Sequence, residues 1–425
     1  MSDEFPDSWK IKTIEEVCEK PQYGFTASAF ENKIGPKLVR ITDITEDRIN
    51  WESVPYCECE EIIAEKYLLE KGDLLFARTG TTGASTLITD VPERAVFASY
   101  LIRLKPKKEI ETYYLNQFFK SSIYWKQITQ KQVGAIQKGI NASVLKSIIL
   151  PYPPLVEQRG IAEVLGTVDE AIQRTDAVIA KAEELKRGLM QRLLTRGIGH
   201  TKFKQTELGE IPETWKMVRL EDVILDIKYG TSLKSTIKEK GIPILRIPNI
   251  IHGKITLDEI KRIEISEKEV ASFLLNEGDL LVVRTNANPD YIGRCAPFKG
   301  IEGKWIYASY LLRLAPLKEK IDTNYLNYFL TGETGRKQIC KIARTSAGNY
   351  NINIPSLLSL KVALPDYTEQ MKISNGFSNL DEKIELEVLK KTKLESLKIN
   401  LMQVLYSGRV RVRLDEGGLH RVGDG

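Results

Sequence analysis

The sequence is poor in the residues that most metal and catalytic sites require. Its three histidines, His200, His252 and His420, do not lie at ligand spacing from one another or from a cysteine. The five cysteines are scattered, odd in number and form no CxxC pair. This pattern argues against a zinc finger or a disulfide framework and is typical of a reducing cytosol. We therefore expect no metal site and a cytoplasmic location.

Long apolar runs and nucleotide-binding loops are also missing. No run of about 18 apolar residues occurs, so no membrane span is expected, and the polar start MSDEFPDSWK is unlike a signal peptide. GTTGAST (80–86) lacks the Lys-Ser/Thr ending of a phosphate-binding loop. PYPPL (151–155) lacks the leading polar residue and the trailing aromatic of the amino-methyltransferase signature, so we interpret it as a break before a helix.

The composition is that of a globular protein with apolar cores. Apolar residues make up 42% and charged residues 28% of the 425 residues, a length that suggests two or three domains. The formal net charge of +5 is mildly basic. A polyanionic partner is compatible with this charge but is not required by it.

An internal repeat of about 200 residues runs through the chain. GDLLFARTG (72–80) returns as GDLLVVRTN (278–286), a separation of 278 − 72 = 206. ASYLIRLKP (98–106) returns as ASYLLRLAP (308–316), a separation of 308 − 98 = 210. We place the change of register between positions 84 and 98. Because the period is far too long for a solenoid, each copy is the size of a domain.

Each copy is expected to have a mixed part followed by a long helix, an α+β organisation. In the first copy, β-like runs (38–44, 74–78 and 96–104) alternate with turn signals, and a helix-like stretch covers about 111–130. After the proline-containing break at 151–155, and again after 364–367, apolar residues recur every three or four positions. The predicted stripe comprises Ile161, Leu165, Val168, Ile172, Ile179, Ala182, Leu185, Leu189 and Leu193, and in the second copy Ile373, Phe377, Leu380, Ile384, Val388, Leu394, Leu397, Leu401 and Leu405.

Forty helical residues span roughly 60 Å. Over most of that length no domain covers the apolar stripe, so another helix has to cover it. We predict that the two long helices pair with each other as a coiled coil. If a pseudo-two-fold axis relates the copies, the pairing is antiparallel.

Candidate binding residues lie in loops at matching positions of the copies. In GDLL, a Gly-Asp turn and a core strand are the favoured explanation. The arginine after the strand, Arg78 or Arg284, is well placed for a phosphate or a guanine edge. The loops that follow it diverge, which suggests that they carry specificity, although a plain solvated loop explains them equally well.

Two further pairs of segments join these candidates. The aromatic-glycine loops at 23–28 and 229–234 suit a close approach to phosphate or an ordinary turn. The basic stretches at 130–139 and 340–350 favour phosphate contacts over a solvated surface. The full set of predicted nucleic-acid contacts is Tyr23, Gly24, Thr26, Arg40, Arg78, Thr79, Gly80, Thr81, Thr82, Lys131, Lys138, Tyr229, Gly230, Ser232, Lys234, Arg246, Arg284, Thr285, Asn286, Asn288, Lys341 and Arg344.

These motifs together resemble the specificity subunit of type I restriction-modification systems. The resemblance rests on LGEIPETWKMVRLEDV (208–223), GDLLxxRT and ASYLxRL in both copies, and LPYPPLVEQRGIAEVLGTVDEAI (150–172) with its counterpart at 364–384. It covers nearly the whole chain. In the counterpart, MKISNGF replaces the more typical RGIAEVL, so we expect the start of the second helix to be less tightly docked.

The resemblance implies a non-catalytic subunit that recognises a bipartite target in double-stranded DNA. It implies target-recognition domains at 1–152 and 201–365, long helices at 153–200 and 366–408, and a tail at 409–425. Partners would be two methylation subunits and restriction subunits, which would carry S-adenosylmethionine and ATP, and the chain itself would need no cofactor.

Two rival readings stay open at the level of the sequence. One is a methyltransferase or nuclease with an unrecognised active site, which binding of S-adenosylmethionine by the purified chain would reveal. The other is an interaction scaffold without a nucleic-acid partner, against which steeply salt-dependent binding to duplex DNA would argue.

Overall fold

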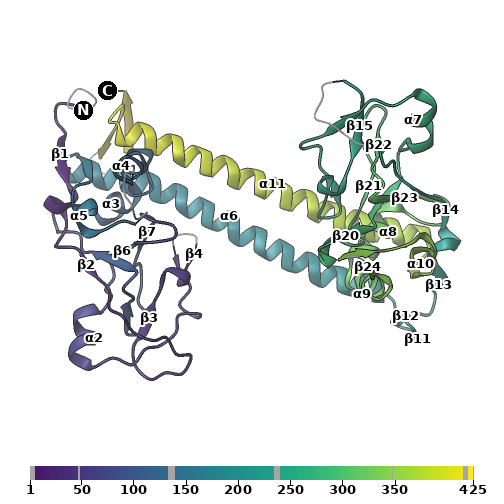
Figure 1. The fold of residues 1–425 in the computed structure, drawn as a ribbon, viewed down its shortest axis with the longest axis horizontal. Coiled ribbons are helices and arrows are strands. Elements are labelled where there is room, and N and C mark those ends of the chain that lie inside the picture. The colour runs from purple at the N-terminus through teal and green to yellow at the C-terminus, as the bar shows by residue number, and fades with distance from the viewer. Residues whose placement is uncertain are drawn as a thin grey trace. The chain divides into compact units, whose positions relative to one another are not determined.

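The chain divides into two compact units. In the computed structural model, residues 5–45, 48–132, 139–233, 240–346, 348–414 and 420–424 are described. The first unit comprises Met1–Asp176 and Leu389–Gly425, and the second comprises Ala177–Val388. Each unit holds one mixed domain and about half of each of two long helices, α6 (Leu155–Arg196) and α11 (Tyr367–Tyr406) (Figure 1).

The domain of the first unit is built on a four-stranded antiparallel sheet of order β2-β9-β6-β7. Beside it, β3 and β8 pair in parallel, and β1 pairs with β10. Its elements are β1 (Lys10–Thr13), α1 (Ile14–Val17), β2 (Gln22–Tyr23), β3 (Lys37–Val39), η2 (Ile41–Asp43), β4 (Ile44–Thr45), β5 (Arg48–Ile49), α2 (Glu61–Tyr67), β6 (Leu74–Ala77), β7 (Ser85–Leu87), β8 (Ala95–Phe97), β9 (Leu101–Leu104), α3 (Thr112–Phe118), α4 (Ser122–Gln132), α5 (Ala142–Lys146) and β10 (Ile149–Tyr152). After α11, the hairpin β27 (Val410–Leu414) and β28 (His420–Asp424) completes this unit.

The domain of the second unit repeats this topology. Its central sheet has the order β14-β23-β19-β21, its parallel pair is β15 with β22, and β13 pairs with β26. Its elements are β11 (Phe203–Thr206), β12 (Gly209–Pro212), β13 (Lys216–Arg219), η3 (Leu220–Val223), β14 (Ile224–Tyr229), β15 (Ile242–Leu245), η4 (Ile247–Asn249), β16 (Ile250–Ile251), β17 (Lys254–Ile255), β18 (Lys261–Ile263), α7 (Glu267–Phe273), β19 (Leu280–Val283), β20 (Thr285–Asn286), η5 (Pro289–Tyr291), β21 (Cys295–Pro297), β22 (Ile306–Tyr307), β23 (Leu311–Pro316), α8 (Thr323–Thr331), α9 (Glu333–Ile342), β24 (Arg344–Ser346), β25 (Asn349–Asn351), α10 (Ile354–Leu358) and β26 (Lys361–Leu364). The sequence repeat is therefore a repeat of structure.

The repeated GDLL phrase has the structural role expected of it. Gly72 has φ +99°, a conformation that glycine adopts without strain, and Leu74 and Leu75 are fully buried in β6. Asp73 accepts a hydrogen bond from the backbone N–H of Glu70 and pairs with the buried Arg103 at 3.3 Å. Burial raises the pKa of Asp73, which its hydrogen bond and Arg103 partly offset.

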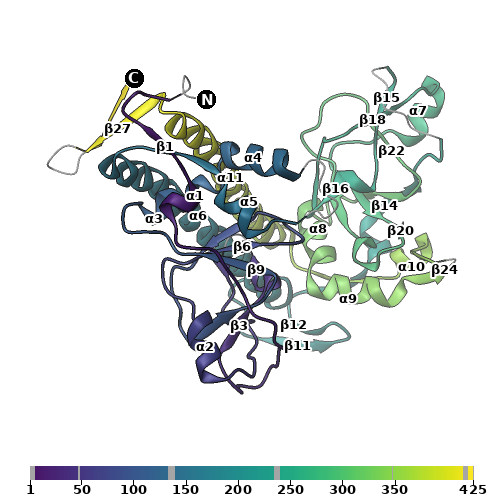
Figure 2. The same ribbon diagram turned by 60° about the vertical axis from the view of Figure 1, so that its left-hand side comes forward.

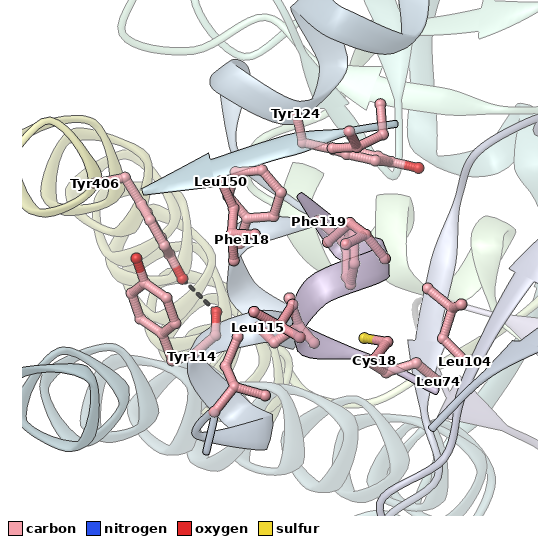
Figure 3. Close-up of a cluster of buried hydrophobic side chains, with 14 of the residues drawn as sticks. Cys18, Leu74, Leu104, Tyr114, Leu115, Phe118, Phe119, Tyr124, Leu150 and Tyr406 are labelled. Atoms are coloured by element: carbon pink, nitrogen blue, oxygen red, sulfur yellow. Dashed lines mark hydrogen bonds between the residues drawn. The ribbon is translucent and has the colours of Figure 1, made fainter. Parts of the chain in front are cut away.

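The core of the first unit joins its domain to the end of α11. Phe118, Phe119 and Tyr124 meet edge to face from α3, the turn after it and α4. Figure 3 shows Tyr406, from α11, directed at this cluster, where its hydroxyl donates to the carbonyl of Tyr114 at 2.5 Å. Both tyrosines are fully buried, so this end of α11 is part of the core of the first domain.

A buried carboxylate holds the start of each long helix. Glu157, in the first turn of α6, accepts from the Trp9 indole N–H at 3.0 Å and from Arg411 at 2.6 Å. A carboxylate at a helix N-terminus is also favoured by the helix dipole.

Glu369 of α11 holds its helix in the same way. It accepts from the Trp215 indole N–H at 3.0 Å and lies 2.9 Å from the His200 ring nitrogen. Ile373 and Phe377 follow it and are buried. The expectation of a less tightly docked second helix is therefore wrong, because Ile373 is buried like Ile161 and Phe377 is buried like Leu165.

The predicted antiparallel pairing of the long helices is confirmed. Within each unit, the parts of α6 and α11 that belong to it lie side by side (Figures 1 and 2). In the first unit Lys398 pairs with Asp169 at 2.6 Å, and in the second unit Lys186 pairs with Asp381. The two ion pairs are related by the repeat, because 169 + 212 = 381 and 186 + 212 = 398.

Three residues of the predicted stripe do not lie in the helix contact. Leu185, Val388 and Leu397 are 53%, 46% and 46% exposed. Leu185 and Leu397 are equivalent positions, and each precedes the lysine of an ion pair. Since successive helical residues differ by about 100° in direction, placing the lysine in the contact turns the leucine outward. The other members of the stripe are buried or half-buried.

Three further expectations are corrected by the structure. The helix-like stretch at 111–130 is two helices, α3 and α4, and the run at 96–104 is two strands, β8 and β9, separated by a turn. The change of register lies earlier than positions 84–98. The Gly83 N–H donates to the Ala77 carbonyl at 2.9 Å, and the Gly293 N–H donates to the equivalent carbonyl, that of Val283, at 2.8 Å. The two glycines are therefore equivalent, and the separation between the copies is already 293 − 83 = 210 at this position. The inserted residues thus lie in the divergent loop after Arg78 and Arg284.

Candidate nucleic-acid interface

Five separate segments of the first domain meet at the carboxyl ends of β3, β6 and β8. We call this region the strand-end junction; in the first domain it comprises residues 22–26, 39–43, 78–83, 98–101 and 139–142. Backbone hydrogen bonds join the segments: Gly24 N–H to Leu101, Phe25 to Phe97, Ala98 to Val39, Arg78 to Tyr100 and Ile140 to Arg78. The sequence-predicted residues Tyr23, Arg40 and Arg78 are therefore brought together.

The second domain forms the same junction from residues 229–231, 245–249, 284–293, 308–311 and 351–353. Its hydrogen bonds are the counterparts of those above: Gly230 N–H to Leu311, Thr231 to Tyr307, Ala308 to Leu245, Arg284 to Tyr310 and Ile352 to Arg284. The two domains thus present one framework, within which the loops differ.

An arginine stacked on a tyrosine is the central feature of the first junction. The Arg78 guanidinium carbon lies 4.6 Å from the centre of the Tyr23 ring, and its Nη1 donates to the Ser99 carbonyl at 2.8 Å. Tyr23 is fixed in turn, because its hydroxyl accepts from the backbone N–H of Ala142 at 2.9 Å. The Arg78 Nε is buried and has no hydrogen-bond partner in the part of the chain that the structure describes.

The second junction repeats this arrangement. Arg284 lies 4.8 Å from the centre of the Tyr229 ring and donates to the Ser309 carbonyl at 3.2 Å. Its Nε is likewise buried without a partner among the described residues. Among the residues that the structure describes, one carbonyl holds each arginine on an aromatic face, which keeps a cation in a defined direction without neutralising it.

Sequence reasoning missed an exposed tyrosine in each junction. Tyr100 is 61% exposed and Tyr310 is 57% exposed, although each lies in the apolar ASYL phrase. Both follow a strand and accept, through their carbonyls, from the N–H of Arg78 or Arg284 at 3.0 Å. The available signal was the return of a tyrosine at the same place in both copies, since tyrosine rings can stack on bases.

The arginines at the ends of β3 and β15 differ in their charge environment. Arg40 binds both carboxylate oxygens of Asp43, at 3.0 and 2.8 Å. In the second domain Asn249 replaces the aspartate, and Arg246 donates to the carbonyl of Glu259 at 3.2 Å. The positive charge of Arg40 is therefore largely compensated by the Asp43 carboxylate, whereas Arg246 contacts a neutral carbonyl.

The predicted glycines have different environments. A Cβ on Gly24 would lie 2.2 Å from the Ala98 carbonyl oxygen, and one on Gly230 would lie 2.3 Å from that of Tyr307. Close packing of the protein backbone thus explains both glycines without a ligand. Gly80 has φ +69° and no heavy atom near its Cβ position, so it serves an open turn.

The remaining predicted loop residues line the rims of the junctions. Asn286 and Asn288 use their side-chain oxygens within the loop, accepting from the N–H groups of Asn288 and Asp290. Thr285 and Asn286 form β20, which pairs with β25. Among the hydroxyl and amide residues of these loops, Thr26, Thr79, Thr81, Ser232 and Asn288 are exposed, while Thr82 is half-buried.

The predicted basic stretches are only partly at the junctions. Arg344 is exposed on β24, in the same small sheet as β20. Lys131 is exposed at the end of α4, whose Tyr124 donates to Gly83 of the divergent loop at 2.8 Å. Lys341 instead lines a cleft with Gln191 of α6. Lys138 and Lys234 lie outside the described residues.

The described residues contain no group of three or more His, Cys, Asp or Glu side chains that could hold a metal ion. Nor does any helix in that part of the chain have the length and apolarity needed to cross a membrane. The junctions themselves present arginines stacked on tyrosines, the exposed Tyr100 and Tyr310, and polar loops that differ between the domains.

Comparison with known proteins gives the family. The sequence model of the type I restriction modification DNA specificity domain matches twice, at residues 6–184 and 212–396. The chain belongs to this family, and each match covers one copy of the repeat.

Several relatives are similar over most of their length. The MjaX protein of Methanocaldococcus jannaschii, provisionally named a type I restriction enzyme specificity subunit, is 30% identical over 96% of this chain and 95% of its own. The EcoKI specificity subunit of Escherichia coli is 24% identical over 79% and 73%. The structure of a type I restriction-modification S subunit from M. genitalium shares the fold, with a TM-score of 0.58, 15% identity and coverage of 94% and 96%.

Proposed function

We propose that this chain is the non-catalytic subunit that recognises the DNA target of a type I restriction-modification complex. The observation that carries the proposal is the pair of strand-end junctions. Each holds an arginine on a tyrosine, as Arg78 on Tyr23 and Arg284 on Tyr229, beside a loop that differs between the domains. A common framework with different loops suits two domains that read two different half-sites.

The chemistry of the junction residues fits duplex DNA. Arginine donates to phosphate oxygens and, in pairs of bonds, to the O6 and N7 acceptors of guanine. The exposed Tyr100 and Tyr310 add aromatic faces that are the same in both domains. We infer that the shared arginines and tyrosines position the duplex and that the divergent loops read bases.

The bases between the half-sites would then remain unread. Each long helix has 40 or more residues, or roughly 60 Å at 1.5 Å per residue, so the helix pair is long enough to separate half-sites by about one turn of B-DNA. We propose that its length determines the spacer of a bipartite target.

The proposed partners are two methylation subunits and restriction subunits of the same system. In this proposal S-adenosylmethionine and ATP bind to those partners, and this chain needs neither. Two observations support these partners: the resemblance of the sequence motifs to specificity subunits, and the relatives that are named type I restriction enzyme specificity subunits. A complex of this kind would act in the cytoplasm.

The experiment is binding of the assembled methylation complex to duplex DNA, with Arg78→Ala and Arg284→Ala as variants. Each is expected to weaken binding by about 1–3 kcal/mol, because a fixed guanidinium contact is lost. Arg219→Ala, an exposed arginine of β13 paired with Glu221, is the control and should bind as wild type. Unchanged affinity in both junction variants, with folding intact, would rule out the junctions as the DNA surface.

A further inference from the structure

The divergent loop of the second domain carries a second stacked arginine that has no counterpart in the first. Arg294 ends the loop, and its carbonyl accepts from the N–H of Val283 at 2.8 Å. Ala84 occupies the equivalent place, accepting from Ala77 at 2.9 Å. Arg284 and Arg294 therefore stand at the two ends of one loop, whereas the first domain has an arginine only at the first end.

The Arg294 guanidinium is fixed by its own loop. Its central carbon lies 3.7 Å from the centre of the Tyr291 ring, the shortest such distance among the described arginines and lysines. Its Nε donates to the carbonyl of Asp290 at 3.1 Å. Tyr291 belongs to the 3-10 turn η5, which Asn288 caps by accepting from the Asp290 N–H at 2.9 Å.

This arrangement leaves one edge of the guanidinium available. The two Nη atoms of Arg294 make no hydrogen bond within the described parts of the chain. An arginine held by stacking and through its Nε presents its Nη groups as a rigid fork, which matches the O6 and N7 pair of guanine. Because the orientation is already fixed, little side-chain entropy is lost on binding.

A base edge suits this position better than a phosphate. Asp290 is an exposed carboxylate in the same turn, and its charge opposes a close approach of phosphate. The arginine is also confined to one domain, as expected of a residue that distinguishes one half-site from the other. We propose that Arg294 reads a guanine in the half-site bound by the second domain, an inference that rests on the proposed function.

The test compares the wild-type chain with Arg294→Ala and Arg294→Lys, each assembled with its methylation subunits. Methylated motifs are read by sequencing DNA from cells that carry each complex, and binding is measured on a duplex set varied at each motif position. In both variants, preference for one G·C pair should fall on the order of 10- to 100-fold, in one half-site only. Lysine should not restore it, because an ammonium lacks the planar fork. Arg219→Ala should leave the motif intact.

Two results would overturn the proposal. An unchanged motif in Arg294→Ala would show that the residue reads no base. A uniform loss of affinity for all duplexes, with the preferred bases unchanged, would show a phosphate contact. Failure of the proposed function gives a different result, because the wild-type complex itself would then show no sequence preference.

Discussion

Substitution of Asp169 should weaken the helix pairing of the first unit far more than an ordinary surface change. The carboxylate accepts from Lys398 at 2.6 Å, from the Tyr113 hydroxyl at 2.5 Å and from Gln117 at 2.7 Å. Asp169→Ala leaves the Lys398 ammonium without its partner. Breaking a fully buried pair costs about 3–5 kcal/mol, and we expect about 2–3 kcal/mol because the two side chains are still 16% and 18% exposed.

Hydrogen exchange measures this loss locally. A change of about 2–3 kcal/mol corresponds to roughly 30- to 150-fold faster exchange of the amides near Asp169 and Lys398, since about 1.4 kcal/mol is a factor of ten. Peptides around the equivalent pair, Lys186 with Asp381, serve as an internal reference and should not change.

Two further variants separate the ion pair from simple loss of packing. Lys398→Met should cost only about 1 kcal/mol, because Asp169 keeps its bonds from Tyr113 and Gln117. The double variant should be more stable than Asp169→Ala alone, since no charge is left unpaired. Exchange in Asp169→Ala within threefold of wild type, or a double variant no more stable than Asp169→Ala, would show that an unpaired buried charge is not the cause of the loss.

Two other predictions concern the helix length and the buried thiols. We would insert four residues after Ala180 and four after Glu387, which adds about one helical turn, or 6 Å, to each long helix. The preferred spacer should then lengthen by one or two base pairs. An active variant with the original spacer would indicate flexible joints instead. Burial raises the pKa of Cys295 from 9.0 to about 12. The unfolded thiol therefore loses its proton first, and stability should fall between pH 9 and 12 by up to about 1.4 kcal/mol per pH unit. In Cys295→Ala the free energy of unfolding should decline less steeply over this pH range. An equal decline would show that the Cys295 thiol does not have a raised pKa. At pH 7.5 a maleimide should label the exposed Cys340 well before Cys295.

Features set by local patterns were predictable from the sequence. The apolar spacing after position 155 predicted a long helix, and α6 spans Leu155–Arg196. The exact return of GDLL and ASYL predicted two domains of like topology, which both central sheets confirm. Such features depend on neighbours three or four residues apart or on repetition, and a sequence displays both directly.

The details of the site depend on contacts that the sequence does not display. The turn that exposes Tyr100 is closed by a hydrogen bond from the Leu101 N–H to the Ala98 carbonyl. The segment contains no glycine or proline, so its sequence does not predict a turn. The stacking of Arg78 on Tyr23 joins the residue that follows β6 to a residue of β2. The exposure of Leu185 follows from an ion pair with the other long helix. Each of these is a tertiary effect that overrides a local pattern.

Recognition of two half-sites by two separate domains can be tested by sequencing the methylated motif in a host that carries the complete system. One strain holds the wild-type chain, and the other holds a chain whose residues 1–150 come from a relative with a different target. We predict a split motif with an unread spacer in both strains, and a change in one half-site only. A continuous motif, or a change of both halves on exchange of one domain, would show that the two domains do not read separate half-sites.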